Sequence, residues 1–194
     1  MKKIWIVIIG LLVLSIFLYG CVKVSVNQPD KSDQSTPQVT KTERIPPSGY
    51  TVYNNQGVSF FHHRIFMKKE NQKPNELVYL EPEPLDNTID CTFDVTREKN
   101  ALSLDQYSQT IVATVNKMTE SNDVTASDIT LAGLPGKEVS YSDTTLVSKF
   151  YITSKDGMIY TIVYMENLYP RMNYTAPRCT EYAQNLISSF EITG

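Results

Sequence analysis

The sequence has few of the residues, and none of the short motifs, on which most enzyme sites depend. It contains 2 histidines, 3 cysteines and 1 tryptophan in 194 residues. No nucleophile elbow (G-x-S-x-G), P-loop, G-x-G-x-x-G, H-E-x-x-H or C-x-x-C pattern is present. We therefore expect a non-enzymatic protein that needs no cofactor. A hydrolase with a dispersed site is the remaining enzymatic alternative.

Basic clusters are also scarce. The formal net charge is −3, and it becomes −5 when the first twenty residues, with Lys2 and Lys3, are removed. Beyond these two lysines, the only basic run is Lys68-Lys69. Because nucleic-acid binding needs a dense positive surface, nucleic acid is not an expected partner.

Only one long apolar run is present, and it lies at the N-terminus. The positive residues Lys2 and Lys3 precede residues 4–19, which are almost wholly apolar. The run is slightly shorter than the ~20 residues of a membrane-spanning helix. A positive end, an apolar core and then a small residue are the order of a secretory signal peptide.

The residues that follow resemble the lipobox of prokaryotic lipoproteins. Leu18 and Gly20 match the positions before the cleavage point, and Cys21 matches the cysteine that is acylated on sulfur, whereas Tyr19 is bulkier than usual. The resemblance implies that residues 1–20 are removed and that Cys21 carries the lipid. The alternative is an uncleaved signal anchor. Both alternatives place the folded part on the extracytoplasmic side of the cell membrane.

Residues 21–48 form the next region, which is rich in Ser, Thr, Gln, Asp, Lys and Pro. Large apolar residues are almost absent after Val26, so this region cannot bury enough surface to offset the entropy of ordering. We expect a disordered tether here and a folded domain over residues 49–194.

The domain begins with β-prone segments separated by turn residues. Residues 50–53 and 58–62 flank a turn that ends at Gly57, which predicts a hairpin. A third strand is expected at 76–81, where Pro82 stops it. Residues 88–97 alternate strictly, which predicts a strand with one wet face. The residues expected on its apolar face are Ile89, Cys91, Phe93 and Val95, and those on its wet face are Asp90, Thr92, Asp94 and Thr96.

Two helices are predicted among further strands. Ser103 and Gln106 make a capping box for a helix that ends near Glu120. Strands follow around Ile129 and at 137–142, 146–153 and 158–165, the last apolar on both faces and therefore central. Pro177 suits the first turn of a last helix, capped by Thr175 or Ala176. The apolar stripe of that helix comprises Cys179, Tyr182, Ala183, Leu186, Ile187 and Phe190.

This order predicts an α+β domain with a central antiparallel sheet flanked by helices. It resembles the PsbP-like family, named for an extrinsic subunit of photosystem II. Residues 53–60 resemble the opening of the family, but residues 62–66 lack its usual Tyr-Pro and tryptophan. The resemblance implies an α/β/α sandwich and a membrane-tethered lipoprotein, and it implies no photosystem binding. The other matching residues are Leu131, Gly133, Pro135, Gly136, Tyr141, Tyr160, Ile162, Tyr164, Leu186, Ser188, Ser189 and Phe190.

Candidate site residues are few. Cys91 and Cys179 fall on apolar stripes and are either disulfide-bonded or two buried thiols. Asp90 and Asp94 are candidates for a Ca²⁺ site, although no glycine-containing Ca²⁺ loop accompanies them. Asn173 begins a glycosylation sequon.

The histidines offer little support for a metal site. His62 and His63 are adjacent in a predicted strand, so their side chains point to opposite faces and cannot easily share a metal ion. We therefore expect no resident metal.

The expected function is binding or assembly at a membrane. The lipid at Cys21 would hold the domain there, where its partner is expected to be another envelope or membrane protein. The alternative is an extracytoplasmic sensor of a small ligand or of Ca²⁺.

Overall fold

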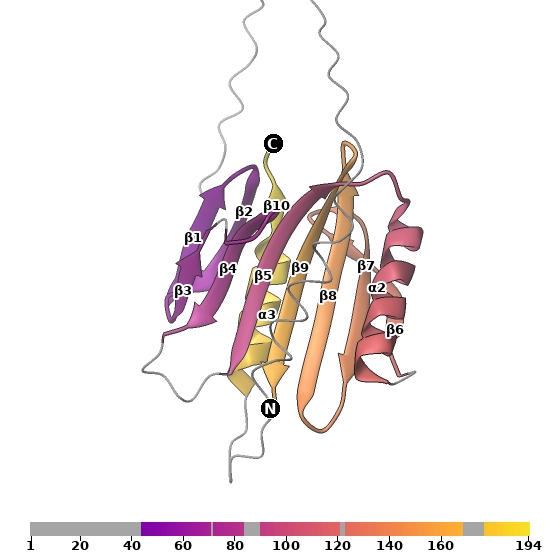
Figure 1. The fold of residues 1–194 in the computed structure, drawn as a ribbon. Coiled ribbons are helices and arrows are strands. Elements are labelled where there is room, and N and C mark those ends of the chain that lie inside the picture. The colour runs from indigo at the N-terminus through magenta and orange to yellow at the C-terminus, as the bar shows by residue number, and fades with distance from the viewer. Residues whose placement is uncertain (1–43, 71, 84–89, 121–122, 169–176) are drawn as a thin grey trace, which may run out of the picture. The chain divides into compact units, whose positions relative to one another are not determined.

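The computed structural model describes residues 44–194 except for 71, 84–89, 121–122 and 169–176. Its first half contains β1 (Tyr50–Asn55), β2 (Val58–His63), β3 (Phe66–Lys69), β4 (Glu76–Pro82), β5 (Cys91–Lys99) and α2 (Leu104–Thr119). Its second half contains β6 (Thr125–Leu131), β7 (Leu134–Ser142), β8 (Leu146–Lys155), β9 (Met158–Asn167), α3 (Pro177–Ser189) and β10 (Glu191–Ile192). Figure 1 shows how these elements are arranged.

The main sheet has seven antiparallel strands in the order β3-β4-β5-β9-β8-β7-β6. Strand β9 lies in the middle, as its two apolar faces predict. Ile162 and Tyr164 of β9 are buried on one face, and Ile159 is buried on the other. The predicted central position is therefore confirmed.

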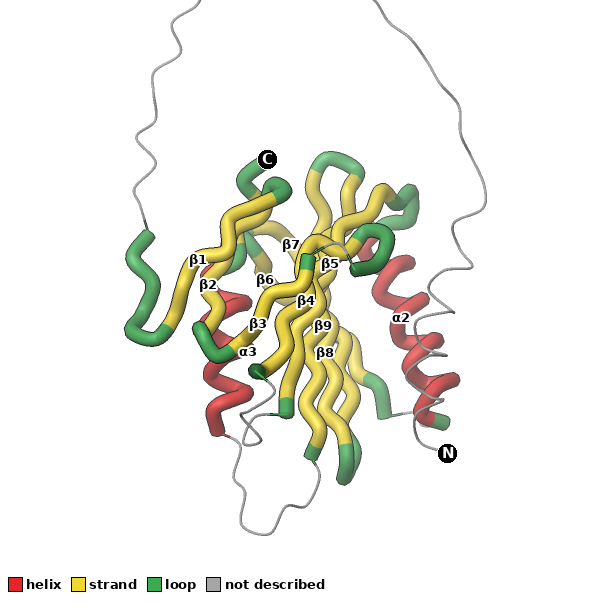
Figure 2. Tube along the Cα trace, turned by 60° about the vertical axis from the view of Figure 1, so that its left-hand side comes forward, coloured by secondary structure: helices red, strands yellow, loops and turns green. Residues whose placement is uncertain are grey.

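The two helices lie on opposite faces of this sheet (Figure 2). Buried residues of α3 belong to one large core cluster with β4, β5 and β9. Leu104, Tyr107 and Ile111 of α2 pack against a separate, smaller cluster formed by β7, β8 and β9. The predicted α+β class, with helices on both sides of the sheet, is confirmed.

Three two-residue hairpins set the registers of the sheets. Their turns, which each end at a glycine, are Gln56-Gly57, Ala132-Gly133 and Asp156-Gly157, with all six φ values between 52° and 81°. Positive φ at both positions suits the right-handed twist of the flanking strands, and glycine takes this conformation without a steric penalty.

Local sequence signals also set the ends of α2. The Ser103 hydroxyl accepts from the Gln106 N–H at 3.2 Å, and the Ser103 N–H donates to the Gln106 side chain at 3.0 Å. The helix ends at Thr119, with Glu120 in the left-handed conformation. The predicted capping box and the predicted helix end are confirmed.

Three features of the N- and C-terminal parts were not predicted. Strands β1 and β2 do not join the main sheet; they form a three-stranded sheet with β10, a short strand that follows α3. Strand β3 lies in a stretch for which the sequence predicted no element. The helix-cap residues expected before Pro177 lie outside the described residues.

Candidate functional site

A groove lies between α3 and the strands of the main sheet. Its volume is about 840 Å³, which is within the range of small-molecule sites. Val147 and Tyr151 of β8 and Tyr164 of β9 line one side, and Gln184 and Ser188 of α3 line another.

The charged groups of the groove are paired. Lys149 Nζ lies 3.1 Å from Glu138 Oε1, and Arg44 Nη2 lies 3.1 Å from Glu191 Oε2. Burial, and next the carboxylate of Glu138, raise the pKa of Tyr151 to about 12. This tyrosine therefore stays protonated at neutral pH and offers a hydroxyl rather than a phenolate to a ligand.

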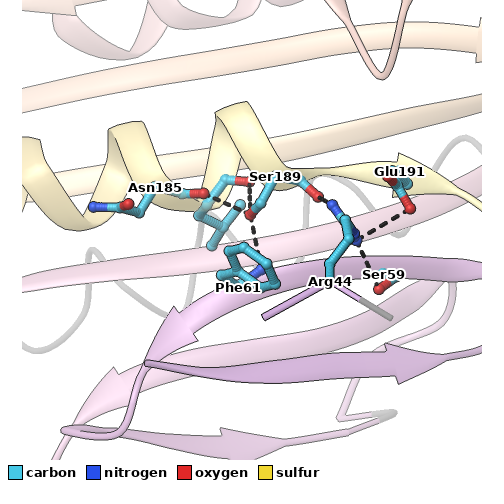
Figure 3. Close-up of polar contacts among 7 residues, drawn as sticks. Arg44, Ser59, Phe61, Asn185, Ser189 and Glu191 are labelled. Carbon is cyan, nitrogen blue, oxygen red and sulfur yellow. Dashed lines mark hydrogen bonds and ion pairs between the residues drawn. The ribbon is translucent and has the colours of Figure 1, made fainter. Parts of the chain in front are cut away.

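Arg44 fixes the start of the domain beside this groove (Figure 3). Its Nη1 donates to the carbonyl oxygen of Ser189 at 2.5 Å, and its Nη2 donates to Ser59 Oγ at 3.0 Å. Its guanidinium carbon lies 5.1 Å from the ring centre of Phe61. A cation is favourable here because it lies at the C-terminal, negative end of the α3 helix dipole. Arg44 therefore contacts the domain although it precedes Gly49, where the folded domain was expected to begin.

The Ser189 hydroxyl joins α3 to the short sheet (Figure 3). It accepts from the Phe61 N–H at 2.8 Å and donates to the Asn185 carbonyl oxygen at 2.5 Å. Ser189 is buried, and so is Phe190 beside it. This arrangement gives a structural reason for the Ser-Ser-Phe sequence at the end of the helix.

A second buried polar pair lies at one side of the groove. The Tyr164 hydroxyl donates to Glu166 Oε2, and both residues are buried. Burial, and next the hydrogen bond with Glu166, raise the pKa of Tyr164. The Tyr164 hydroxyl therefore stays protonated and holds the Glu166 carboxylate by its hydrogen bond, and we assign this pair a structural role.

Comparison with known proteins identifies the fold. Neither a family model nor a curated protein matches this chain. The solution structure of the cyanobacterial PsbP protein (CyanoP) of Synechocystis sp. PCC 6803 superposes with a TM-score of 0.51 and 13% sequence identity, covering 79% of this chain and 98% of that one. The chain has the PsbP-like fold.

A second similar structure is LpqN, a protein involved in cell envelope biogenesis of Mycobacterium tuberculosis. Its TM-score is 0.45 and its sequence identity 12%, with 75% of this chain and 91% of LpqN covered. The superposition with CyanoP, and not this weaker one, shows the PsbP-like fold expected from the turn residues. Gly136 illustrates why such residues matter, because a Cβ atom there would lie 2.7 Å from the carbonyl oxygen of Ile152.

Cys91 and Cys179 are bonded in the PsbP-like domain. The disulfide joins β5 to α3, with a Cα–Cα distance of 6.2 Å and a sequence separation of 88 residues. Both residues are almost wholly buried. The bond therefore fixes the start of α3 on the sheet and forms part of the same layer that carries the groove.

Asp90 and Asp94 do not converge. Asp90 Oδ1 accepts from Asn167 Nδ2 at 2.8 Å, whereas Asp94 Oδ2 lies 3.1 Å from Lys73 Nζ. Lys73 Nζ also lies 3.4 Å from Glu76, a buried residue that the sequence did not single out. The strand face expected to be solvent-exposed is largely buried at Asp94, whose side chain is 16% exposed.

No metal cluster gathers in the described ranges of the chain, where no three His, Cys, Asp or Glu residues lie close enough to hold an ion. His62 is buried, and its Nδ1 lies 3.2 Å from the His63 carbonyl oxygen. The ring of His63 lies against Tyr50 and Tyr182. The two histidines therefore serve as packing residues in different surroundings.

Several predicted site residues lie outside the described residues: Leu18, Gly20, Cys21 and Asn173. Among the residues that are described, no helix is long and apolar enough to cross a membrane. The groove and the role of Arg44 were not predicted, because both depend on where α3 lies on the sheet and no local pattern marks them.

Proposed function

We propose that this protein is a membrane-tethered, extracytoplasmic lipoprotein whose PsbP-like domain binds an envelope or membrane protein without catalysing a reaction. The observation that carries this proposal is the buried Cys91–Cys179 disulfide, in a chain whose N-terminus resembles a lipoprotein signal. Stable disulfides are typical of proteins outside the cytoplasm. The disulfide and the signal-like N-terminus thus both support a location outside the cytoplasm.

The proposed tether would let the domain act by binding alone. Two acyl chains at Cys21 give stable anchoring, at ~0.8 kcal/mol per buried CH₂. A flexible linker then raises the effective concentration of the domain near membrane partners. We assign partner binding to the groove, since it combines two tyrosines with the polar side chains of α3.

Anchoring is tested with a Cys21→Ala variant of the full chain. We expect the variant to lose the acyl mass and to accumulate with its N-terminal segment uncleaved. A matched control is the Cys91→Ala/Cys179→Ala double variant, which should remain acylated. The uncleaved signal anchor would be supported by a different result: the wild-type protein carries no acyl group, and the Cys21→Ala variant has the same N-terminus and the same membrane binding as the wild type.

The groove is tested by photo-crosslinking in intact cells. A photo-reactive amino acid at Gln184, an exposed groove residue of α3, should give a defined crosslinked product. The same amino acid at Thr114, an exposed residue of α2 outside the groove, should not. Equal products from both positions would contradict the assignment of binding to the groove.

A small ligand in the same groove is the second candidate function. The volume of about 840 Å³ favours it. Because Lys149 and Arg44 are each paired with a carboxylate, the groove favours a neutral compound. A Ca²⁺ sensor gains no support, because Asp90 and Asp94 have separate partners.

A further inference from the structure

The two edges of the seven-stranded sheet differ in how they are protected. Strand β3 has only four residues and carries the exposed Lys68 and Lys69. Strand β6 has seven residues, five of them exposed, and it contains no lysine or proline. Short length and lysine side chains are common protections against edge-to-edge pairing. Strand β6 has neither, so it is the edge suited to accept another strand.

The hairpin register shows which backbone groups β6 offers. The two-residue turn makes Leu131 and Leu134 a hydrogen-bonded pair. Antiparallel pairs alternate, so Ile129, Ser127 and Thr125 also bond to β7. The N–H and carbonyl groups of Ala126, Asp128 and Thr130 point the other way, where the described part of the chain supplies no strand.

Proline placement agrees with this alternation. Pro135 lies opposite Thr130, in a pair that needs no N–H group between the two strands. Pairing of β7 with β8 begins one residue later, at Gly136 and Thr153. The turn and the proline therefore give the same result independently: the backbone N–H and carbonyl groups of Ala126, Asp128 and Thr130 point away from β7.

The side chains of β6 complement a second copy of the same strand. Centring an antiparallel pair on Ile129 sets this residue opposite its own copy, in a non-bonded pair where side chains approach most closely. The same register sets Asp128 opposite Thr130 of the second copy on both sides. A register centred on Asp128 would instead oppose two carboxylates, which is unfavourable.

We propose that two copies of this protein pair edge to edge through β6, antiparallel and related by a twofold axis at Ile129. The pairing joins the two main sheets into one continuous sheet. Only residues 127–131 overlap, so the contact is smaller than the 1,200–2,000 Å² typical of stable interfaces. Its strength at low concentration rests on the proposed membrane tether, which confines copies to one surface.

Site-specific crosslinking tests the register. The full chain with Ile129→Cys, in phosphatidylcholine vesicles treated with copper–phenanthroline, should form a disulfide-linked dimer at least tenfold faster than the chain with Thr125→Cys. Thr125 is in the same strand and on the same face but outside the overlap. The wild-type chain reports any crosslinking through Cys21. Equal rates for Ile129→Cys and Thr125→Cys would overturn the proposal.

Proline substitutions test the backbone contacts. Thr130→Pro removes an outward N–H inside the overlap, whereas Ala126→Pro removes one outside it; neither residue donates to β7. Light scattering in detergent at high protein concentration should show dimers of the wild-type chain and of Ala126→Pro, and monomers of Thr130→Pro. The proposal is wrong if the Thr130→Pro chain is still a dimer, or if the wild-type chain is a monomer. Because this measurement needs no lipid, a failure of anchoring and a failure of pairing give different results.

Discussion

The two faces of the seven-stranded sheet are covered to very different depths. On the α3 face, one cluster of 20 buried residues includes α3, the short sheet and the disulfide. On the α2 face, the fully buried cluster contains only Val139, Ile152 and Ile159. Helix α2 packs chiefly on β7 and β8, and its Tyr107 reaches Thr161 of β9.

The difference shows where the free energy of folding is concentrated. Aromatic side chains such as Phe60, Phe93 and Tyr182 fill the α3 layer, and each large aromatic buries much apolar area. The α2 layer holds aliphatic residues and half-buried rings. We infer that the α3 layer holds the groove rigid, whereas α2 can loosen without unfolding the domain.

Removing the disulfide should have the largest effect. In the Cys91→Ala/Cys179→Ala variant, the unfolded chain regains the freedom that a crosslink 88 residues apart removes. The chain-entropy model gives a loss of about 4–5 kcal/mol in the free energy of unfolding. Urea unfolding of the oxidised wild type and the variant measures it. A loss below about 1 kcal/mol would mean that packing alone fixes α3.

A matched pair of Phe→Ala substitutions compares the two layers directly. Phe93 is 1% exposed and packs against Phe66 and Tyr164, with ring centres 5.3 and 5.4 Å away. Phe93→Ala should cost about 3–5 kcal/mol in the free energy of unfolding. Phe150, on the α2 face, is half-buried, so Phe150→Ala should cost about 1–2 kcal/mol. Equal costs in urea unfolding would contradict the unequal layers.

Local sequence signals predicted the elements that short-range physics determines. Ser103, Glu120 and Gly157 marked the ends of α2 and a hairpin turn, because caps and positive φ depend on neighbouring residues. The alternation in β9 predicted its central place, since burial on both faces requires cover on both sides.

Features that depend on distant pairing were not predictable. Strand β3 has only four residues, two of them exposed, so its pairing with β4 leaves little periodicity in the sequence. Strand β10 consists of two residues whose pairing with β2 requires α3 to be in place. Arg44 likewise lies in a polar stretch and gains its contacts only in the folded domain, as does the groove beside it.

The smallest predicted effect is a pH response of opposite sign in the two layers. On the α3 side, burial lowers the pKa of His62 below its ordinary 6.5, and in the described chain its Nε2 has no hydrogen-bond partner. The unfolded chain then binds this proton more readily, so stability is lost as the pH falls below about 6.5.

On the α2 face, burial raises the pKa of Asp94 above 3.8, although Lys73 opposes the shift. Here the folded chain binds the proton more readily, so stability is gained as the pH falls through that raised pKa toward 3.8. Urea midpoints between pH 7.5 and 4.5 should therefore fall less steeply in His62→Gln, and should fall more steeply at the acid end in Asp94→Asn. Unchanged slopes in both variants would show that neither layer contributes a titrating group of its own.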